Sequence, residues 1–371
     1  MNFWGINGMI FVAYSLICYL YKKEKIFLNI AFIHLTFIAA FRGIKVGTDT
    51  YNYCKIYMKI ADGTFNGSVL VPKGSLLQYY YKLVSFILTK ENGYMLSTSI
   101  PTMIGFYFLI KKYVKNYYFG VYLFVAGYIY FFSMNAGRQM LAVSFTIISF
   151  VLWNDRKYIF SFLAYFVAIQ IHNSAIIFGV FYLISIINWN LSIYIVYLIG
   201  VFIACKSINF FVSIFVRLFP RYKWMLRRSF IYDLSSGGRL SLIYAAICIF
   251  SILVMLYWII YSKYNFRVKI NYYVYVTPKV KMNENEVQFY FKIMAVMWIS
   301  AVLYLIYPSV ILFTRISYYL FIYFIILLPE CLNNMKYLKK ITMITIYIAF
   351  FLIMVYQLQG NYSGVLEYDF Y

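Results

Sequence analysis

Residues 117–153 read YYFGVYLFVAGYIYFFSMNAGRQMLAVSFTIISFVLW, and this stretch decides the class of fold. Two apolar runs, 117–134 and 139–153, flank the polar sequence NAGRQ at 135–139, and Arg138 is the one charged residue in the whole stretch. A membrane-spanning helix needs about 20 mostly apolar residues. The stretch therefore predicts two spanning helices joined by a polar turn.

The rest of the chain repeats this pattern. Of its 371 residues, 64% are hydrophobic and 12% are charged, whereas soluble domains are about 45–50% apolar and about 25% charged. Further apolar runs lie at 3–21, 26–41, 93–110, 158–171, 174–188, 191–205, 241–261, 287–306, 311–329 and 341–358. We predict an all-α polytopic integral membrane protein with about 11–13 transmembrane helices, forming one membrane domain over residues 1–371.

Two stretches leave the number of spans open. Residues 76–89 carry Gln78 and Lys82 within an aromatic face, so they form either a span or an interfacial or re-entrant helix. Residues 158–188 form either two spans or one long kinked helix.

The net charge of +22 has to be explained on this apolar chain. A nucleic-acid binder would carry its cations on a polar surface, which this composition does not supply. Basic turns are typical of the cytoplasmic side, and the chain has them at 22–25, 111–115, 156–157 and 336–340, with a longer basic loop at 263–286. Long outer loops then lie at 42–75 and 206–240.

Arginine and lysine separate by side in this topology. Eight of the ten arginines fall on the outer side, namely Arg42, Arg138, Arg217, Arg221, Arg227, Arg228, Arg239 and Arg315. The planar guanidinium fork suits bidentate recognition of phosphate or carboxylate, and few acidic residues lie on that side. We expect an anionic substrate there, with lipid headgroups as the alternative for the loop arginines. Because the cysteines are scattered, we expect no metal site.

Polar motifs follow several of the predicted spans. Residues 42–51 read RGIKVGTDTY, and Asp49 either serves the site or caps a helix over 50–60. Residues 172–174 read HNS within an apolar run, where a lone histidine is either a structural hydrogen-bonding group or part of a site. Arg315 is followed by Tyr318 at the start of another apolar run.

The order and spacing of these motifs resemble the EpsG family, polysaccharide polymerases related to Wzy-type O-antigen polymerases. The resemblance rests on Arg42…Val46-Gly47-Thr48-Asp49-Thr50…Tyr53, Asn135…Arg138-Gln139…Ala142, His172-Asn173-Ser174-Ala175-Ile176-Ile177 and Arg315…Tyr318. Where the family often has a Glu-Pro-Gly-Tyr-like element, residues 72–75 read PKGS and offer no carboxylate. Arg227 and Gly238 have the spacing of the Arg-x10-Gly element of Wzy loops.

The resemblance implies a GT-C-like fold in the bacterial inner (cytoplasmic) membrane. It implies transfer of a glycan chain from undecaprenyl pyrophosphate to a new lipid-linked repeat unit at the outer face. Donor and acceptor would both be undecaprenyl-pyrophosphate-linked oligosaccharides, with membrane lipids and a chain-length regulator as further partners and no nucleic acid. We expect no cofactor and a metal-independent reaction, because arginines can supply the charge stabilisation.

Such a reaction needs cations beside the leaving pyrophosphate and a base for the attacking sugar hydroxyl. We expect Arg138 and Arg315 to stabilise the leaving group. Asp49 is the preferred base, and His172 is the second candidate or positions the acceptor. The remaining expected substrate-binding residues are Arg42, Thr48, Thr50, Gln139, Asn173, Arg217, Arg221, Arg227, Arg228, Arg239 and Tyr318.

Three other functions remain open from the sequence. An O-antigen ligase would share the donor chemistry and use a different acceptor. A lipid-linked oligosaccharide flippase would need ionisable groups along the depth of the bundle, where only His34 and Lys292 are conspicuous. A non-catalytic scaffold would not need arginines at the mouths of spans.

Overall fold

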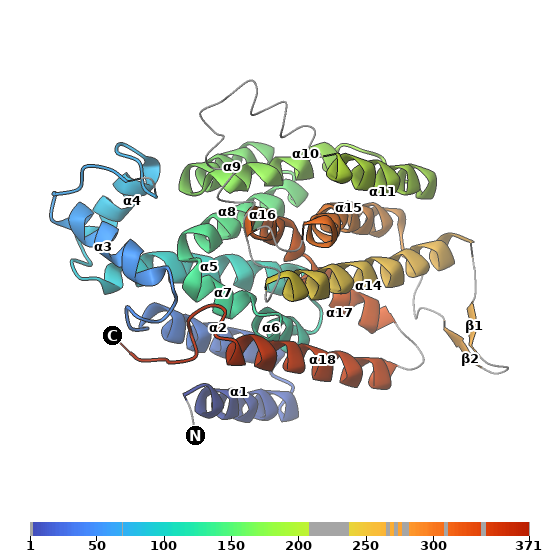
Figure 1. Cartoon of the computed structure of the whole chain (residues 1–371). Coiled ribbons are helices and arrows are strands. Elements are labelled where there is room, and N and C mark those ends of the chain that lie inside the picture. The colour runs from blue at the N-terminus through green and yellow to red at the C-terminus, as the bar shows by residue number, and fades with distance from the viewer. Residues whose placement is uncertain are drawn as a thin grey trace. The chain divides into compact units, whose positions relative to one another are not determined.

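The structure is a computed structural model that describes residues 3–68, 70–207, 237–264, 268–270, 274–276, 282–307, 311–334 and 339–370. Its elements in chain order are α1 (Phe3–Leu20), α2 (Glu24–Ala40), α3 (Thr50–Ala61), α4 (Leu76–Ser85), α5 (Asn92–Tyr113), α6 (Tyr117–Ala126), α7 (Ile129–Asn135), α8 (Gly137–Asn154), α9 (Tyr158–Ile171), the 3-10 helix η1 (Asn173–Phe178), α10 (Gly179–Ser185), α11 (Leu191–Lys206), α14 (Gly237–Tyr264), β1 (Val268–Ile270), β2 (Val274–Val276), α15 (Glu284–Ile306), α16 (Ile311–Phe321), α17 (Phe324–Asn334) and α18 (Lys339–Gln359). Figure 1 shows these elements.

The predicted fold class is confirmed: the chain is an all-α polytopic membrane protein. Apart from the antiparallel β1–β2 hairpin, the regular elements of the described residues are helices. Five of the described helices are long and apolar enough to cross a membrane, or up to seven if each of two bent pairs is one span. Shorter apolar helices, α9, η1 with α10, and α11, account for further predicted runs. The total of 11–13 spans stays a prediction.

Two runs predicted as continuous, 117–134 and 311–329, are bent in the structure, and residues 158–188 are divided as one of their two alternatives predicts. α6 and α7 meet at 48°, because Gly127 ends α6 and Tyr128 adopts a left-handed φ of 66°. α16 and α17 meet at 45°. Residues 158–188 divide into α9, η1 and α10, with the first break at His172, whose backbone is extended. The left-handed Tyr128 therefore interrupts a run that hydropathy alone joins.

The ambiguous stretch 76–89 forms the short helix α4. Ser75 caps it by accepting a hydrogen bond from the Gln78 amide. Its ten residues extend only about 15 Å at 1.5 Å per residue, half of the roughly 30 Å hydrocarbon thickness of a bilayer. α4 by itself is therefore too short to cross, which favours the interfacial or re-entrant interpretation.

The predicted long loops contain regular structure. α3 occupies 50–61 within the expected outer loop 42–75. α14 begins at Gly237, so Arg239 lies in the first turn of a helix and not in the loop predicted over 206–240. α14 also extends to Tyr264, and the β1–β2 hairpin lies within the predicted loop 263–286.

The chain divides into two compact units, Met1–Ile176 with Met343–Tyr371, and Ile177–Thr342. Each is described by itself, and the single domain over residues 1–371 stays a prediction. In the first unit, α8 packs between α5 and α9. A Cβ at Gly105 of α5 would lie 2.7 Å from the Ser144 side chain of α8, so this glycine allows the two helices to approach closely.

The basic turns of the first unit gather at one end. Lys112 at the end of α5 forms an ion pair with Asp155 in the α8–α9 turn. Lys115 lines a hollow together with residues 22–26. Arg42 lies beyond the opposite end of α2, whose 17 residues extend about 25 Å. The basic turns at 22–25, 111–115 and 156–157 therefore share an end, and the motif residues that follow α2 lie away from it.

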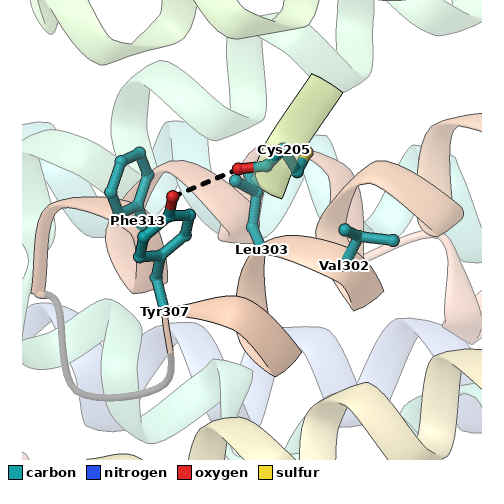
Figure 2. Packing of buried hydrophobic residues seen from close by; sticks show 5 residues of the cluster. All are labelled: Cys205, Val302, Leu303, Tyr307 and Phe313. Atoms are coloured by element: carbon teal, nitrogen blue, oxygen red, sulfur yellow. Dashed lines mark hydrogen bonds between the residues drawn. The ribbon is translucent and has the colours of Figure 1, made fainter. Parts of the chain in front are cut away.

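The second unit is built around α15, which packs against α10, α11, α14 and α16. Figure 2 shows the buried cluster of Cys205, Val302, Leu303, Tyr307 and Phe313, where α11, α15 and α16 meet. The Tyr307 hydroxyl donates a hydrogen bond to the Cys205 carbonyl at 3.1 Å, near the end of α11. The ring of Tyr307 lies 4.6 Å from that of Phe313.

Candidate functional site

The first two sequence motifs meet in the structure. We call residues 42–50 the motif loop. Thr48 Oγ1 and the Asp49 amide both donate hydrogen bonds to Asn135 Oδ1, at 2.8 and 3.0 Å. Thr50 Oγ1 donates to the Met134 carbonyl at 3.2 Å. The loop that carries Asp49 is thereby fixed against the junction of α7 and α8, three residues before Arg138.

Arg42, the first residue of the motif loop, fixes the start of the loop to the helices around it. Its side chain is 0% exposed. The guanidinium donates to the Ala39 carbonyl, to Ser99 Oγ at 2.9 Å and to the Met134 carbonyl at 3.0 Å. Burial lowers its pKa, since desolvation disfavours the charged form. Arg42 therefore joins α2, α5 and α7, and its contact with substrate stays a prediction.

Asp49 stands at the N-cap position of α3 but does not cap it. The helix over 50–60 expected under the capping alternative exists as α3. The Asp49 side chain makes no capping hydrogen bond, and the residue is half-buried. The structure thus places a carboxylate at the start of α3 without using it for the local hydrogen bond that this position commonly needs.

Arg138 lies beside a group of tyrosines from α3, α4 and α5. Its guanidinium carbon is 5.7 Å from the centre of the Tyr53 ring, a cation–π distance. Tyr53 stacks on Tyr94, with ring centres 5.4 Å apart, and Tyr94 meets Tyr81 edge-to-face at 6.0 Å. Burial raises the pKa of Tyr81 well above its ordinary value, an effect that Arg138 opposes, so the hydroxyl stays protonated.

His172 lies at the same end of the α8–α9 hairpin as Arg138. Ser149 Oγ on α8 and Ser161 Oγ on α9 are 3.1 Å apart and fix the register of the two antiparallel helices. Arg138 precedes Ser149 by the same number of residues as His172 follows Ser161. An α-helix rises by the same distance for each residue. The two residues therefore lie at similar depth. His172 Nδ1 shares a 2.6 Å hydrogen bond with Ser174 Oγ.

The remaining predicted site residues of the first unit are Gln139 and Asn173. Gln139 is buried in the first turn of α8, next to Arg138. Asn173 begins η1 and is exposed. Gln139 directly follows Arg138, and Asn173 directly follows His172. Each therefore lies next to one of the two residues that the hairpin register brings to the same depth.

Other predicted residues belong to the second unit or lie outside the described residues. Arg315 is exposed on α16, and Tyr318 of the same helix is buried against Tyr244 of α14, with ring centres 6.2 Å apart. Arg239 is exposed in the first turn of α14. Arg217, Arg221, Arg227 and Arg228 fall within 208–236, outside the described part of the chain.

The structure adds a partner that the sequence did not reveal, the C-terminal segment 360–370. The Gly43 amide donates to the Asp369 carbonyl and the Gly47 amide to the Gly364 carbonyl, both at 2.8 Å. Trp4 Nε1 donates to the Val365 carbonyl at 2.7 Å. Figure 1 shows this segment beside the start of the chain. It covers part of the motif loop through these hydrogen bonds, and no motif in its sequence indicates this role.

Metal-binding side chains do not gather in the described residues: no three His, Cys, Asp or Glu side chains group closely enough to hold an ion. The site in the first unit instead combines one half-buried carboxylate, Asp49, with the guanidinium of Arg138, hydroxyl groups and an imidazole at one depth. This set can donate hydrogen bonds to an anion and accept a proton.

These features define a class, a multi-pass helical membrane protein whose polar motif residues gather at one end of a helical unit. The EpsG family profile matches residues 25–370, and the chain belongs to the EpsG family, the family of Wzy-type polysaccharide polymerases. No curated protein and no solved structure matches the chain. Family membership makes it a polysaccharide-polymerase-like membrane protein.

Proposed function

We propose that the chain is a polysaccharide polymerase that transfers a growing glycan from undecaprenyl pyrophosphate to a lipid-linked repeat unit, at the outer face of the bacterial inner membrane. The observation that carries this proposal is the double hydrogen bond from Thr48 and Asp49 to Asn135. It holds the loop that carries Asp49 beside α8, whose first turn carries Arg138, and so supports a base and a cation at one site.

Each group has a part in the transfer. The acceptor hydroxyl attacks the anomeric carbon, and Asp49 takes its proton as the base. The bond from that carbon to the diphosphate oxygen breaks, and Arg138 stabilises the negative charge that develops on the leaving diphosphate. His172 positions the acceptor or serves as the second candidate base. The expected role of Arg315, which belongs to the second unit, stays a prediction.

An apolar cavity in the first unit supports a lipid-linked substrate. It has a volume of about 650 Å³, and its lining includes Trp4, His34, Ile38, Phe131 and Phe351, within the range of typical ligand pockets. Trp4 also contacts the segment 360–370 that covers the motif loop. The His34 ring is held on both nitrogens, by Tyr14 at 3.3 Å and Asn7 at 3.1 Å. A polyprenyl chain is the apolar substrate portion that suits this lining.

Substitution of Arg138 tests the function. In a host that lacks its own copy of the gene, Arg138→Gln should leave the amount of protein in the membrane unchanged. Long-chain polymer should fall by about 100-fold or more, the usual effect of removing one donor to a developing anion, while single-repeat glycan persists. Polymer length is measured by gel separation of the extracted glycans.

Arg156→Gln is the matched control. Arg156 lies in the turn at the other end of the same helical hairpin and is exposed. This variant should support wild-type polymer length. A full polymer ladder from Arg138→Gln would contradict the proposed site. Loss of the single-repeat product as well would indicate a ligase or flippase instead of a polymerase.

A further inference from the structure

Two tyrosine hydroxyls beside Arg138 are buried and have no hydrogen-bond partner in the described structure. Tyr81 and Tyr94 are both 0% exposed, and neither hydroxyl oxygen is satisfied. Arg138 Nε is a third buried donor in the same condition. A buried donor without a partner is destabilising, so three such donors around the start of α8 indicate a place prepared for an acceptor.

The start of α8 has no side-chain cap. Ala136 occupies the N-cap position and provides no side-chain capping bond. The neighbouring Asn135 cannot serve, because its amide oxygen already accepts from Thr48 and Asp49. The first-turn amides of an uncapped helix carry partial positive charge and favour anions. α8 has 18 residues, long enough for its aligned dipoles to contribute.

The Tyr94 hydroxyl is directed at this helix start. A Cβ built on Gly137 would lie only 2.8 Å from the Tyr94 hydroxyl oxygen and 3.4 Å from Thr98 Oγ1. The absence of a side chain at Gly137 therefore leaves the hydroxyl facing the first turn of α8. Thr98 Oγ1 donates to the Tyr94 carbonyl at 2.9 Å, so it is already engaged.

We propose that the N-terminus of α8, the Tyr94 hydroxyl and the Arg138 guanidinium form an oxyanion subsite that binds a phosphate group. Resting on the proposed function, the phosphate belongs to the diphosphate of the lipid-linked donor. When the bond from the anomeric carbon to the diphosphate oxygen breaks, the electron pair stays on that oxygen, and this subsite holds the resulting charge. Tyr94 thereby becomes a further substrate-binding residue, supplied by α5, which the sequence motifs do not include.

Tyr94→Phe tests the subsite on the full chain in zwitterionic lipid nanodiscs, with inorganic pyrophosphate as the probe. The variant keeps the ring that stacks on Tyr53 and removes only the hydroxyl. Calorimetric titration should give a Kd for pyrophosphate that is about tenfold or more weaker than that of the wild-type chain, as expected for a hydrogen bond to a charged group. Without pyrophosphate, its unfolding temperature should equal or exceed that of the wild type, because the hydroxyl that is removed had no partner.

Tyr304→Phe is the matched control, since the Tyr304 hydroxyl of α15 is equally buried and equally unsatisfied. It should bind pyrophosphate like the wild-type chain. Equal Kd values for Tyr94→Phe and wild type, or no binding by the wild type, would overturn the subsite. Competition by anionic phospholipid in the nanodisc would overturn the assignment to the substrate diphosphate and point to a lipid headgroup. Pyrophosphate binding needs no glycosyl transfer, so this result is independent of the polymerase assignment.

Discussion

Gly47 is the residue on which the docking of the motif loop depends most directly. Its φ is 95°, and a Cβ there would lie 2.6 Å from both the Met134 carbonyl oxygen and Thr50 Oγ1. Gly47→Ala should therefore combine backbone strain with a steric overlap and lower the free energy of unfolding by about 3 kcal/mol. Thermal unfolding in detergent measures this, together with loss of long-chain polymer in cells.

Gly63, which lies two residues after the end of α3, is the glycine to compare with Gly47. It has a positive φ of 77°, but a Cβ there would meet nothing within 4 Å. Gly63→Ala should cost only the backbone conformation, about 1 kcal/mol, and should leave polymer length unchanged. Equal effects of the two substitutions would show that the contact with α7 and α8 does not hold the motif loop.

At the scale of single residues, the sequence indicated which residues belong to the candidate site better than it indicated which residues they contact. Asp49 and Arg138 could be singled out, because a carboxylate and a guanidinium beside apolar runs need a reason to be there. The role of Asn135 could not, because its two donors lie 86 and 87 residues away in the chain. Tyr94 was missed for a related reason, since one tyrosine among 43 carries no signal until its hydroxyl is located.

At the scale of elements, α4 decides whether the segment after α3 crosses the membrane. Leu83 near the end of α4, together with Phe86 and Ile87 that directly follow the helix, presents an exposed apolar face, and Ile87 is 85% exposed. A short helix with such a face lies in the membrane interface, with its apolar side buried about 5–10 Å deep. We expect α4 to rest there, at the margin of the site.

A spin label at Ile87→Cys measures that depth. The five native cysteines are buried, so labelling should be confined to the engineered position. Collisions with a water-soluble nickel complex and with oxygen should place this label near the headgroups. A label at Ile348→Cys, 55% exposed on α18, should lie deep in the hydrocarbon. Equal depths would mean that residues 76–89 form a crossing segment.

Hydropathy predicted most helices at this scale and missed the bends between α6 and α7 and between α16 and α17. α9 has the predicted bounds 158–171, and α2, α5 and α8 differ from theirs by a few residues. The bend between α6 and α7 depends on the left-handed conformation of Tyr128, which a window of apolar residues does not reveal. The breaks at Asn135 and at His172, which the sequence did indicate, lie beside the candidate site.

At the scale of the whole molecule, the segment 360–370 should be required for activity. It supplies carbonyl partners for the Gly43 and Gly47 amides, and the Tyr368 hydroxyl donates to the Ile38 carbonyl at 2.6 Å. A chain ending at Gln359 should still enter the membrane, because α18 is complete. It should lose long-chain polymer by about tenfold or more, since each lost hydrogen bond that fixes the motif loop contributes about 1 kcal/mol.

Polymer gels and membrane fractionation of the truncated chain check this expectation. A synthetic peptide of residues 360–370 is a useful addition, because partial recovery of polymer length in permeabilised cells would separate loss of the contact from general misfolding. Wild-type polymer from the truncated chain would show that the motif loop is held by α7 and α8 alone.

The contact between the motif loop and this segment also sets an order of events during biosynthesis. Tyr368 and Ile38 are 330 residues apart in the chain, and chains generally fold in the order in which they leave the ribosome. The motif loop therefore emerges and enters the membrane long before its carbonyl partners have been translated. A nascent or prematurely terminated chain has the loop without its cover, so the site is completed only after residues 360–370 have been synthesised.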